Sequence, residues 1–302
     1  MYRSFYTLIF CLFVCSCLYS QTNKALFVAI DKYPPNSGWN QIHATNDYKL
    51  VLPMLKRYGY KEADVKVLLN EKATKDNIVK ALLKMCNTAK KGDYIYIHFS
   101  CHGQQMIDDN GDEPDGLDEA LIPYDARRRY AKGVYEGENH LRDDQLGAFI
   151  NKIREKTGSK GNVTVVFDAC HSGTADRDGD DEWYARGTSY VFAPEGCQIK
   201  MPNSETVSLH LQNGKHLAPI TVFAACKPDE INYEYKSKVD STYYGSLSYA
   251  LCSVLETSRG KSNAEFYELL NNEIQTMFAG RRRKQTPYFE STDDNRVFKI
   301  SR

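Results

Sequence analysis

The sequence has no surplus of charge of either sign, since 39 Lys and Arg residues balance 39 Asp and Glu residues among 302. A balanced chain has no overall field that draws it onto nucleic acid, so we expect no nucleic-acid partner. Proline is scarce, with 10 residues, and the chain has neither internal repeats nor low-complexity tracts, which excludes collagen-like and disordered proteins. What remains is a globular composition, 42% apolar and 26% charged.

Long apolar runs are absent except at the start of the chain. Arg3 is the only charge before residue 21, and Phe5–Leu18 is apolar or cysteine apart from one threonine and one serine. This run is shorter than the ~20 residues that a membrane-spanning helix needs. We therefore interpret residues 1–20 as a secretory signal cleaved near Ser20, which predicts an exported protein, periplasmic or secreted, with no membrane span in the mature chain. A lipoprotein anchored through Cys17 is the alternative.

Cysteine pairs with zinc-binding spacing are also missing. Nine cysteines are present, and no CxxC pair occurs among them. Six over the rest of the chain are too few for a small disulfide-stapled protein. Their spacing leaves the disulfide pattern open. The six outside the predicted signal are Cys86, Cys101, Cys170, Cys197, Cys226 and Cys252.

Strand and helix patterns alternate along the rest of the chain, which predicts an α/β fold with a largely parallel sheet. Apolar runs of strand length predict strands at 25–30, 65–69, 94–99, 163–167, 220–225, 287–289 and 297–300. Helical periodicity or capping residues predict helices near 45–58, with Asp47 at the first one's start, and at 76–89, 143–156, 245–257 and 263–278. Residues 174–216 show little periodicity and are interpreted as a linker.

Two predicted strands end in reactive side chains. His102 follows the strand at 94–99, and Cys170 follows the strand at 163–167. Because the carboxyl ends of parallel strands share one edge, we expect the two side chains to meet there. An imidazole beside a thiol is the minimum for nucleophilic acyl transfer. The backbone N–H groups of Gly103 and Cys170 are then candidates for an oxyanion hole.

Both reactive residues also have a purely structural interpretation. Cys170 would then be a buried thiol, and His102 a hydrogen-bonded histidine at the end of a strand. Strand alternation points Cys101, the rival nucleophile, away from His102. The same alternation places Ser100 on the side of His102 and Asp168 on the side of Cys170. Asp168 either binds a cationic group of the substrate or caps the following turn.

Acidic residues cluster in three stretches, 108–119, 143–144 and 176–182. Carboxylates at this density suit calcium, although solvated loop charge explains them equally well. An EF-hand is rejected because Glu113 stands where that loop needs glycine.

These segments together resemble a metacaspase, a caspase-fold cysteine peptidase. The resemblance runs from about Lys24 to Ile300 and rests on Ser-Cys-His-Gly-Gln-Gln at 100–105, Asp-Gly-Leu-Asp-Glu at 115–119 and Asp-Ala-Cys-His-Ser-Gly at 168–173. True caspases fit less well, because Asp168 stands where they have glutamine. Two departures from the metacaspase pattern are Cys101 at a usual glycine and Ala169 at a frequent cysteine.

The resemblance implies a three-layer α/β/α sandwich in one peptidase domain over 21–302, with a large-subunit-like part at 24–173, a linker at 174–216 and a small-subunit-like part at 217–301. It implies His102 as acid and base and Cys170 as nucleophile. Cleavage after Arg or Lys is implied, with substrate-binding residues matching Asp47, Ser100 and Asp168. The calcium ligands that it implies match Asp118, Asp143, Asp144 and Asp178.

We therefore expect a monomeric, exported cysteine endopeptidase whose partner is a peptide or protein with Arg or Lys before the scissile bond. Calcium is the expected cofactor, and no organic cofactor is expected. A catalytically silent caspase-fold binding module and a caspase-fold peptidase with non-basic specificity are the alternatives. If the enzyme cuts itself in the linker, the basic candidates are Arg177, Arg186, Lys200 and Lys215.

Overall fold

A computed structural model describes residues 21–111, 113, 115–171, 184–197, 209–227, 230–280 and 284–301. The predicted signal at 1–20 and the motif residues Ser172 and Gly173 lie outside them, as do Asp178, Arg177 and Lys200. No helix in these ranges is long and apolar enough to cross a bilayer.

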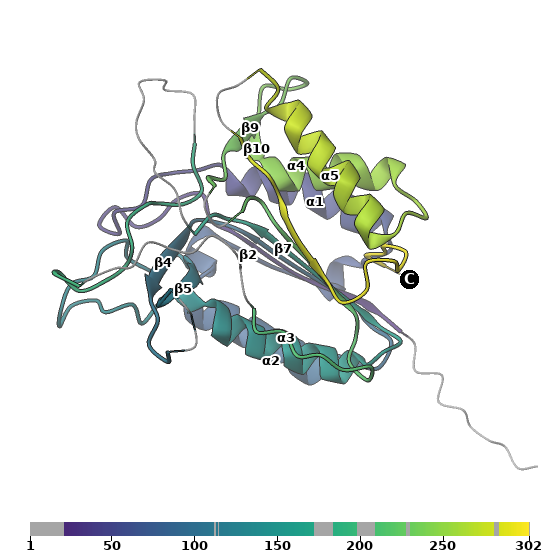
Figure 1. The fold of residues 1–302 in the computed structure, drawn as a ribbon, viewed down its shortest axis with the longest axis horizontal. Helices are drawn as coiled ribbons and strands as arrows, with labels where there is room; N and C mark the ends of the chain where they lie inside the picture. Colours follow the sequence, from purple (N-terminus) through teal and green to yellow (C-terminus); the bar gives the residue numbers. More distant parts are fainter. Residues whose placement is uncertain are drawn as a thin grey trace, which may run out of the picture.

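A six-stranded sheet forms the middle of the molecule, with strand order β11-β8-β7-β3-β1-β2 (Figure 1). All neighbours are parallel except β11, which pairs antiparallel with β8. Both β3 and β7 are buried along their whole length, which explains their continuous apolar runs. The strands are β1 (Asn23–Ala29), β2 (Val65–Leu69), β3 (Tyr94–Ser100), β7 (Asn162–Asp168), β8 (Ile220–Ala224) and β11 (Tyr288–Ser291).

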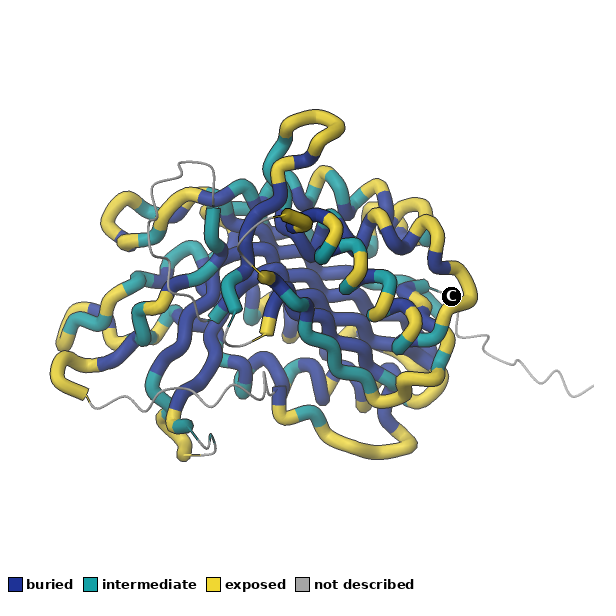
Figure 2. Tube along the Cα trace, turned by 45° about the horizontal axis from the view of Figure 1, so that its top comes forward, coloured by how far each residue is buried: buried dark blue, intermediate teal, exposed yellow. Residues whose placement is uncertain are grey.

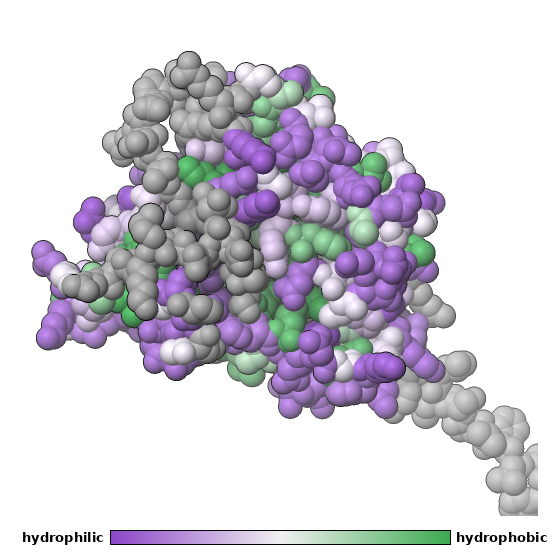
Figure 3. Space-filling view, viewed as in Figure 1, coloured by the Kyte–Doolittle hydropathy of each residue, from purple (hydrophilic) through white to green (hydrophobic). Residues whose placement is uncertain are grey.

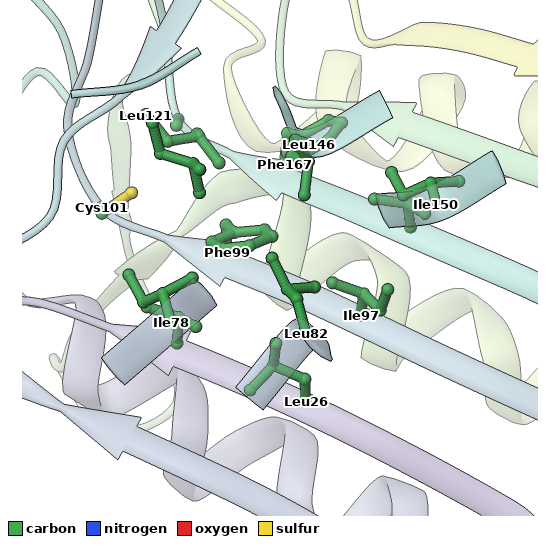
Figure 4. Packing of buried hydrophobic residues seen from close by; sticks show 14 of the residues in the cluster. Leu26, Ile78, Leu82, Ile97, Phe99, Cys101, Leu121, Leu146, Ile150 and Phe167 are labelled. Carbon is green, nitrogen blue, oxygen red and sulfur yellow. The ribbon is translucent and has the colours of Figure 1, made fainter. Parts of the chain in front are cut away.

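Helices cover both faces of this sheet and confirm the predicted α/β/α sandwich. One face carries α2 (Lys75–Thr88) and α3 (Asp143–Thr157), and the other carries α1 (Ala44–Arg57), α4 (Ser246–Thr257) and α5 (Asn263–Met277) (Figure 1). Two apolar cores result, one on each face. The buried strands run between these helical layers (Figure 2), and Figure 4 shows Leu26, Ile97 and Phe99 of the sheet against Leu82 of α2.

Short elements at the carboxyl end of the sheet were not predicted from the sequence. An antiparallel sheet comprises β4 (Gly103–Ile107), β5 (Leu117–Leu121) and β6 (Leu141–Arg142), and a hairpin comprises β9 (Glu234–Lys236) and β10 (Tyr243–Gly245). Single 3₁₀ turns occur at Glu62–Asp64 and Asn70–Lys72. These short segments carry polar residues or glycine, so neither an apolar run nor period-two alternation can be read from them.

Two predictions about elements are wrong. Residues 297–300 form no strand, and only Val297 makes a single bridge, to Ser262. The first helix begins at Ala44, so Asp47 lies inside its first turn and is not its N-cap. The Asp31 carboxylate instead accepts the Thr45 N–H and hydroxyl, which stabilises that helix end and leaves Asp47 available for other contacts.

The face in Figure 3 is mostly hydrophilic where it is coloured. Large hydrophobic side chains that are exposed among the described residues are few: Leu83, Val134, Val239 and Val297.

Candidate active site

The predicted reactive residues lie at one edge of the sheet, because β3 and β7 are neighbours. Ser100 pairs with Asp168 in the parallel register, so His102 and Cys170 each stand two residues beyond a matched pair. The segments touch at Gly103, where an added Cβ would lie only 2.6 Å from the Cys170 carbonyl oxygen. A glycine is therefore required for this close approach.

His102 is held as a neutral base. Its Nε2 lies 2.9 Å from the Asn40 carbonyl oxygen, and its ring stacks on Trp39 at 4.9 Å between centroids. Burial lowers the pKa of His102 to about 4, although the bond to Asn40 opposes this shift. When Nε2 carries the proton and donates it to Asn40, Nδ1 holds a lone pair. Nδ1 is buried and has no hydrogen-bond partner among the described residues.

Cys170 is a buried thiol with a backbone partner. Its Sγ donates to the Glu230 carbonyl oxygen at 3.0 Å, and Cys226 Sγ approaches the same oxygen at 3.3 Å. Cys226, at the end of β8, had no role in the sequence analysis. The six described cysteines form no disulfide in this structure.

Cys101 lies on the opposite side of its strand from this site, as strand alternation predicts. It belongs to the core beneath α2 and α3 (Figure 4). Burial raises the pKa of Cys101 to about 12, so its thiol stays protonated and unreactive at neutral pH.

The N–H groups proposed as an oxyanion hole both bind one carbonyl oxygen, that of Arg186. Gly103 N–H donates to it at 3.2 Å and Cys170 N–H at 3.0 Å. The next residue, Gly187, lies so close that an added Cβ would be 3.0 Å from Cys170 Cβ. The Arg186–Gly187 peptide bond therefore lies against the backbone and Cβ of Cys170.

The Arg186 side chain is fully buried in a pocket of carboxylates. Its Nη1 donates to Asp47 Oδ2 at 2.6 Å and to Ser100 Oγ at 2.7 Å, and lies 3.5 Å from Asp168 Oδ1. Its Nε and Nη2 donate to Glu234 Oε1 at 3.1 and 2.9 Å. The three predicted pocket residues thus converge on one guanidinium, together with Glu234, which the sequence analysis missed.

Hydrogen bonds hold these carboxylates in place. Asp47 accepts the Gly245 N–H at 2.8 Å, and the Ser100 hydroxyl also donates to it. Asp168 accepts the Asn232 amide at 2.8 Å and the Ser248 N–H at 2.8 Å. Asp47 is therefore not the cap of its own helix, and Asp168 accepts an N–H from the first turn of α4.

The pocket is electrostatically suited to a cation. Burial raises the pKa of Asp47 to about 6, with Asp168 adding to the shift and Arg186 opposing it. Burial alone would lower the pKa of Arg186, but the surrounding carboxylates raise it well above its usual range, so the guanidinium stays charged. A positive side chain offsets the mutual repulsion of these buried carboxylates.

The backbone before Arg186 runs as an added strand beside β9. Arg186 N–H donates to the Asn232 carbonyl at 2.9 Å, and Glu234 N–H donates to the Tyr184 carbonyl at 2.9 Å. Ala185 forms an antiparallel bridge with Tyr233. Extended peptides bind proteins in this way, by adding a strand to an exposed edge.

Comparison with known proteins identifies the family of this chain. The family profile described as Caspase domain matches residues 22–298. The chain belongs to the caspase-domain family.

Relatives of this caspase domain include metacaspases of plants and fungi. Metacaspase-2 of Arabidopsis thaliana is 27% identical over 252 residues, which are 78% of this chain and 52% of that protein. Metacaspase-1 of Mycosarcoma maydis is 32% identical over 186 residues, 60% of this chain and 40% of that protein. The chain thus spans about half or less of the length of these curated relatives.

Solved structures share the fold. A Geobacter sulfurreducens protein matches with a TM-score of 0.58 at 22% identity, over 90% of this chain and 94% of that one. Caspase-1 from Spodoptera frugiperda matches with a TM-score of 0.56 at 12% identity, over 93% of this chain and 90% of that one.

Among the described residues, the predicted calcium ligands Asp118 and Asp143 do not belong to one acidic group. Asp108, Asp109 and Asp118 bring carboxylate oxygens within 4.8 Å of one another, and Arg142 pairs with both Asp109 and Asp118. Asp143, in the first turn of α3, is not in that group.

Asp143 instead lies with Glu119 and Asp144. Burial raises the pKa of Asp143 to about 8, and the charges of Glu119 and Asp144 add to the shift. Its Oδ2 is buried with no hydrogen-bond partner among the described residues. A buried carboxylate oxygen without a donor fits the chemistry of a calcium site, although Asp144 already accepts the Asn110 amide. The Asp118 contribution would require Arg142 to release that carboxylate.

Proposed function

We propose that the protein is a cysteine endopeptidase that cleaves after Arg or Lys, with Cys170 as nucleophile and His102 as acid and base. One observation carries the proposal: Arg186 fills the carboxylate pocket while its carbonyl oxygen accepts the N–H groups of Gly103 and Cys170. An acidic side chain in the same pocket would meet three buried carboxylates, which disfavours the alternative of acidic specificity.

The residues support a thiolate mechanism. His102 Nδ1 takes the proton of Cys170 Sγ, which must first turn from the Glu230 carbonyl. The thiolate attacks the peptide carbonyl, and the oxyanion that forms is stabilised by the N–H groups of Gly103 and Cys170. Protonated His102 donates to the leaving amine, and water then hydrolyses the thioester, so that the free thiol returns.

The same contacts support self-cleavage between Arg186 and Gly187. Among the basic linker candidates, Arg177 and Lys200 lie outside the described residues, and Lys215 is exposed. Arg186 is the candidate bound in the pocket. The intact chain is then a latent form, because its own linker occupies the position that a substrate needs.

We also propose that calcium binds beside the site. Asp143 and Asp144 would hold it, with Glu119 or Asp118 completing the oxygen ligands. The ion would supply positive charge that orders these loops, and it would take no part in acyl transfer. Asp178 lies outside the described residues. Export, which rests on residues 1–20, remains a prediction.

Activity is tested with the chain purified without its predicted signal, incubated with matched fluorogenic peptides that differ only in Arg, Lys, Ala or Asp before the scissile bond. We expect turnover of the basic peptides and intact-mass evidence of a cut after Arg186. Cys170→Ala should show neither, and Arg186→Gln should lose that cut. Turnover of the Asp peptide alone, or activity in Cys170→Ala, would overturn the proposal.

A further inference from the structure

Glu234 contacts a different edge of the bound guanidinium from the residues that the sequence predicts. Asp47, Ser100 and Asp168 all face Nη1, whereas Glu234 Oε1 accepts both Nε–H and Nη2–H. The side chain of Arg186 is thus recognised along two edges. An Nε–H donor is a property of arginine, and lysine has no counterpart to it.

Other contacts hold Glu234 in place independently of Arg186. Its Oε1 accepts the His43 N–H at 2.8 Å, and its Oε2 lies 2.6 Å from His43 Nδ1. Glu234 also pairs with Gly245 across the β9–β10 hairpin. Since His43 immediately precedes α1, which carries Asp47, the two carboxylates are fixed relative to each other.

Charge and burial make this contact selective. The Glu234 side chain is 0% exposed. Burial alone would raise its pKa, but Arg186 and the bonds from His43 lower it, so Glu234 is a carboxylate. A lysine ammonium places its donors on a single nitrogen, so in this pocket it cannot reproduce the bonds to both edges. A buried carboxylate would then be left short of donors, which costs binding.

We propose that Glu234 is a specificity-determining residue that makes the enzyme prefer arginine to lysine before the scissile bond. This inference rests on the proposed function, which by itself admits either residue. Lost hydrogen bonds to a buried charge are expected to lower kcat/KM for lysine by about 10- to 100-fold relative to arginine.

The test measures kcat/KM on two peptides that differ only in Arg or Lys, using wild type, Glu234→Gln and Asp47→Asn. For Glu234→Gln we expect the Arg reaction to fall by at least about tenfold and the Lys reaction to change by less than about threefold, so the Arg:Lys ratio falls towards one. Asp47→Asn is the matched control, since Asp47 faces the end of the side chain: both reactions should fall, and the ratio should stay near that of wild type.

The ratio does not depend on how much of each preparation has processed itself, because both peptides are measured on the same sample. An equal fall on both peptides in Glu234→Gln would assign Glu234 a structural role and overturn the inference. Equal wild-type rates on Arg and Lys would also overturn it, while leaving the proposed function intact. Failure of wild type on both peptides would instead refute the proposed function.

Glu234→Gln removes a buried charge that also binds His43, so its folding is checked by circular dichroism. If it does not fold, the inference is tested on wild type alone with a matched pair of peptide aldehydes ending in Arg or Lys. We expect the Arg aldehyde to inhibit about 10- to 100-fold more tightly, and equal inhibition constants would contradict the inference.

Discussion

The two candidate catalytic side chains each have a backbone carbonyl as partner in this structure. His102 bonds to Asn40 and Cys170 bonds to Glu230. The first contact orients a neutral imidazole whose Nδ1 has no hydrogen-bond partner among the described residues, and the second directs the thiol towards the Glu230 carbonyl. Under the proposed mechanism, Cys170 must turn from Glu230 before His102 can take its proton.

We predict that His102 and Cys170 contribute to catalysis as one unit. Cys170→Ala and His102→Ala should each abolish peptide hydrolysis, and the double variant should be little slower than either single one, because both residues act in the same transition state. Steady-state rates on an Arg peptide measure this. Cys101→Ala is the control and should retain activity. Loss of activity in Cys101→Ala with full activity in Cys170→Ala would reverse the assignment.

Short motifs pointed to most of the side chains at this site and to the N–H groups of Gly103 and Cys170, but not to the Asn40 carbonyl or the Glu234 side chain. His102, Cys170, Ser100 and Asp168 belong to short motifs at strand ends, which the order of a parallel sheet brings together. Asn40 contacts His102 through its backbone carbonyl. Every residue type has this group, so the residue type at position 40 does not reveal the contact. Glu234 was missed because β9 has only three residues.

At the level of elements, long strands and helices were predicted nearly to their ends, since burial on both faces produces a clear pattern. Helix α1 shows where prediction from local sequence fails. A side chain from another segment, Asp31, stabilises its start, so local sequence placed the cap on the wrong residue. The predicted strand at 297–300 failed because a short apolar run is equally compatible with a buried coil segment.

We predict calcium dependence through the start of α3. Asp143→Asn should raise the calcium concentration that gives half-maximal activity by about tenfold, because it removes a buried oxygen ligand without touching the dyad. Titration of peptide hydrolysis with calcium measures this. Asp76→Asn is the matched control, as it neutralises an exposed carboxylate in the first turn of α2. Equal wild-type rates in chelator and in millimolar calcium would exclude the dependence.

At the scale of the whole molecule, the linker is part of the site. Residues 174–216 show little periodicity, and the described part of this segment makes its contacts with distant residues rather than with near neighbours. Within the described residues 184–197, Ala185 forms a bridge with Tyr233, just before β9, and Phe192 forms one with Met106 of β4. Such pairing leaves no periodic pattern within the segment itself.

We predict that self-cleavage after Arg186 is intramolecular, because the bond already lies in the chain's own site. The half-time of processing should stay constant over about a hundredfold range of protein concentration, as followed by gel or intact mass. Added active enzyme should cut Cys170→Ala chains slowly, since their Arg186 is fully buried. A rate that rises in proportion to concentration would show cleavage between molecules instead.

Because Arg186 occupies the carboxylate pocket of its own chain, it also affects any search for ligands of this protein. A tethered segment competes at an effective concentration in the millimolar range, which no dilution of the sample lowers. If the linker fills the pocket about 99% of the time, a ligand binds the uncut chain about 100-fold more weakly than the open site. A screen against the uncut protein would therefore miss good inhibitors. The same compounds should be detected in a screen against protein in which the Arg186–Gly187 bond is cut and the segment can leave the pocket.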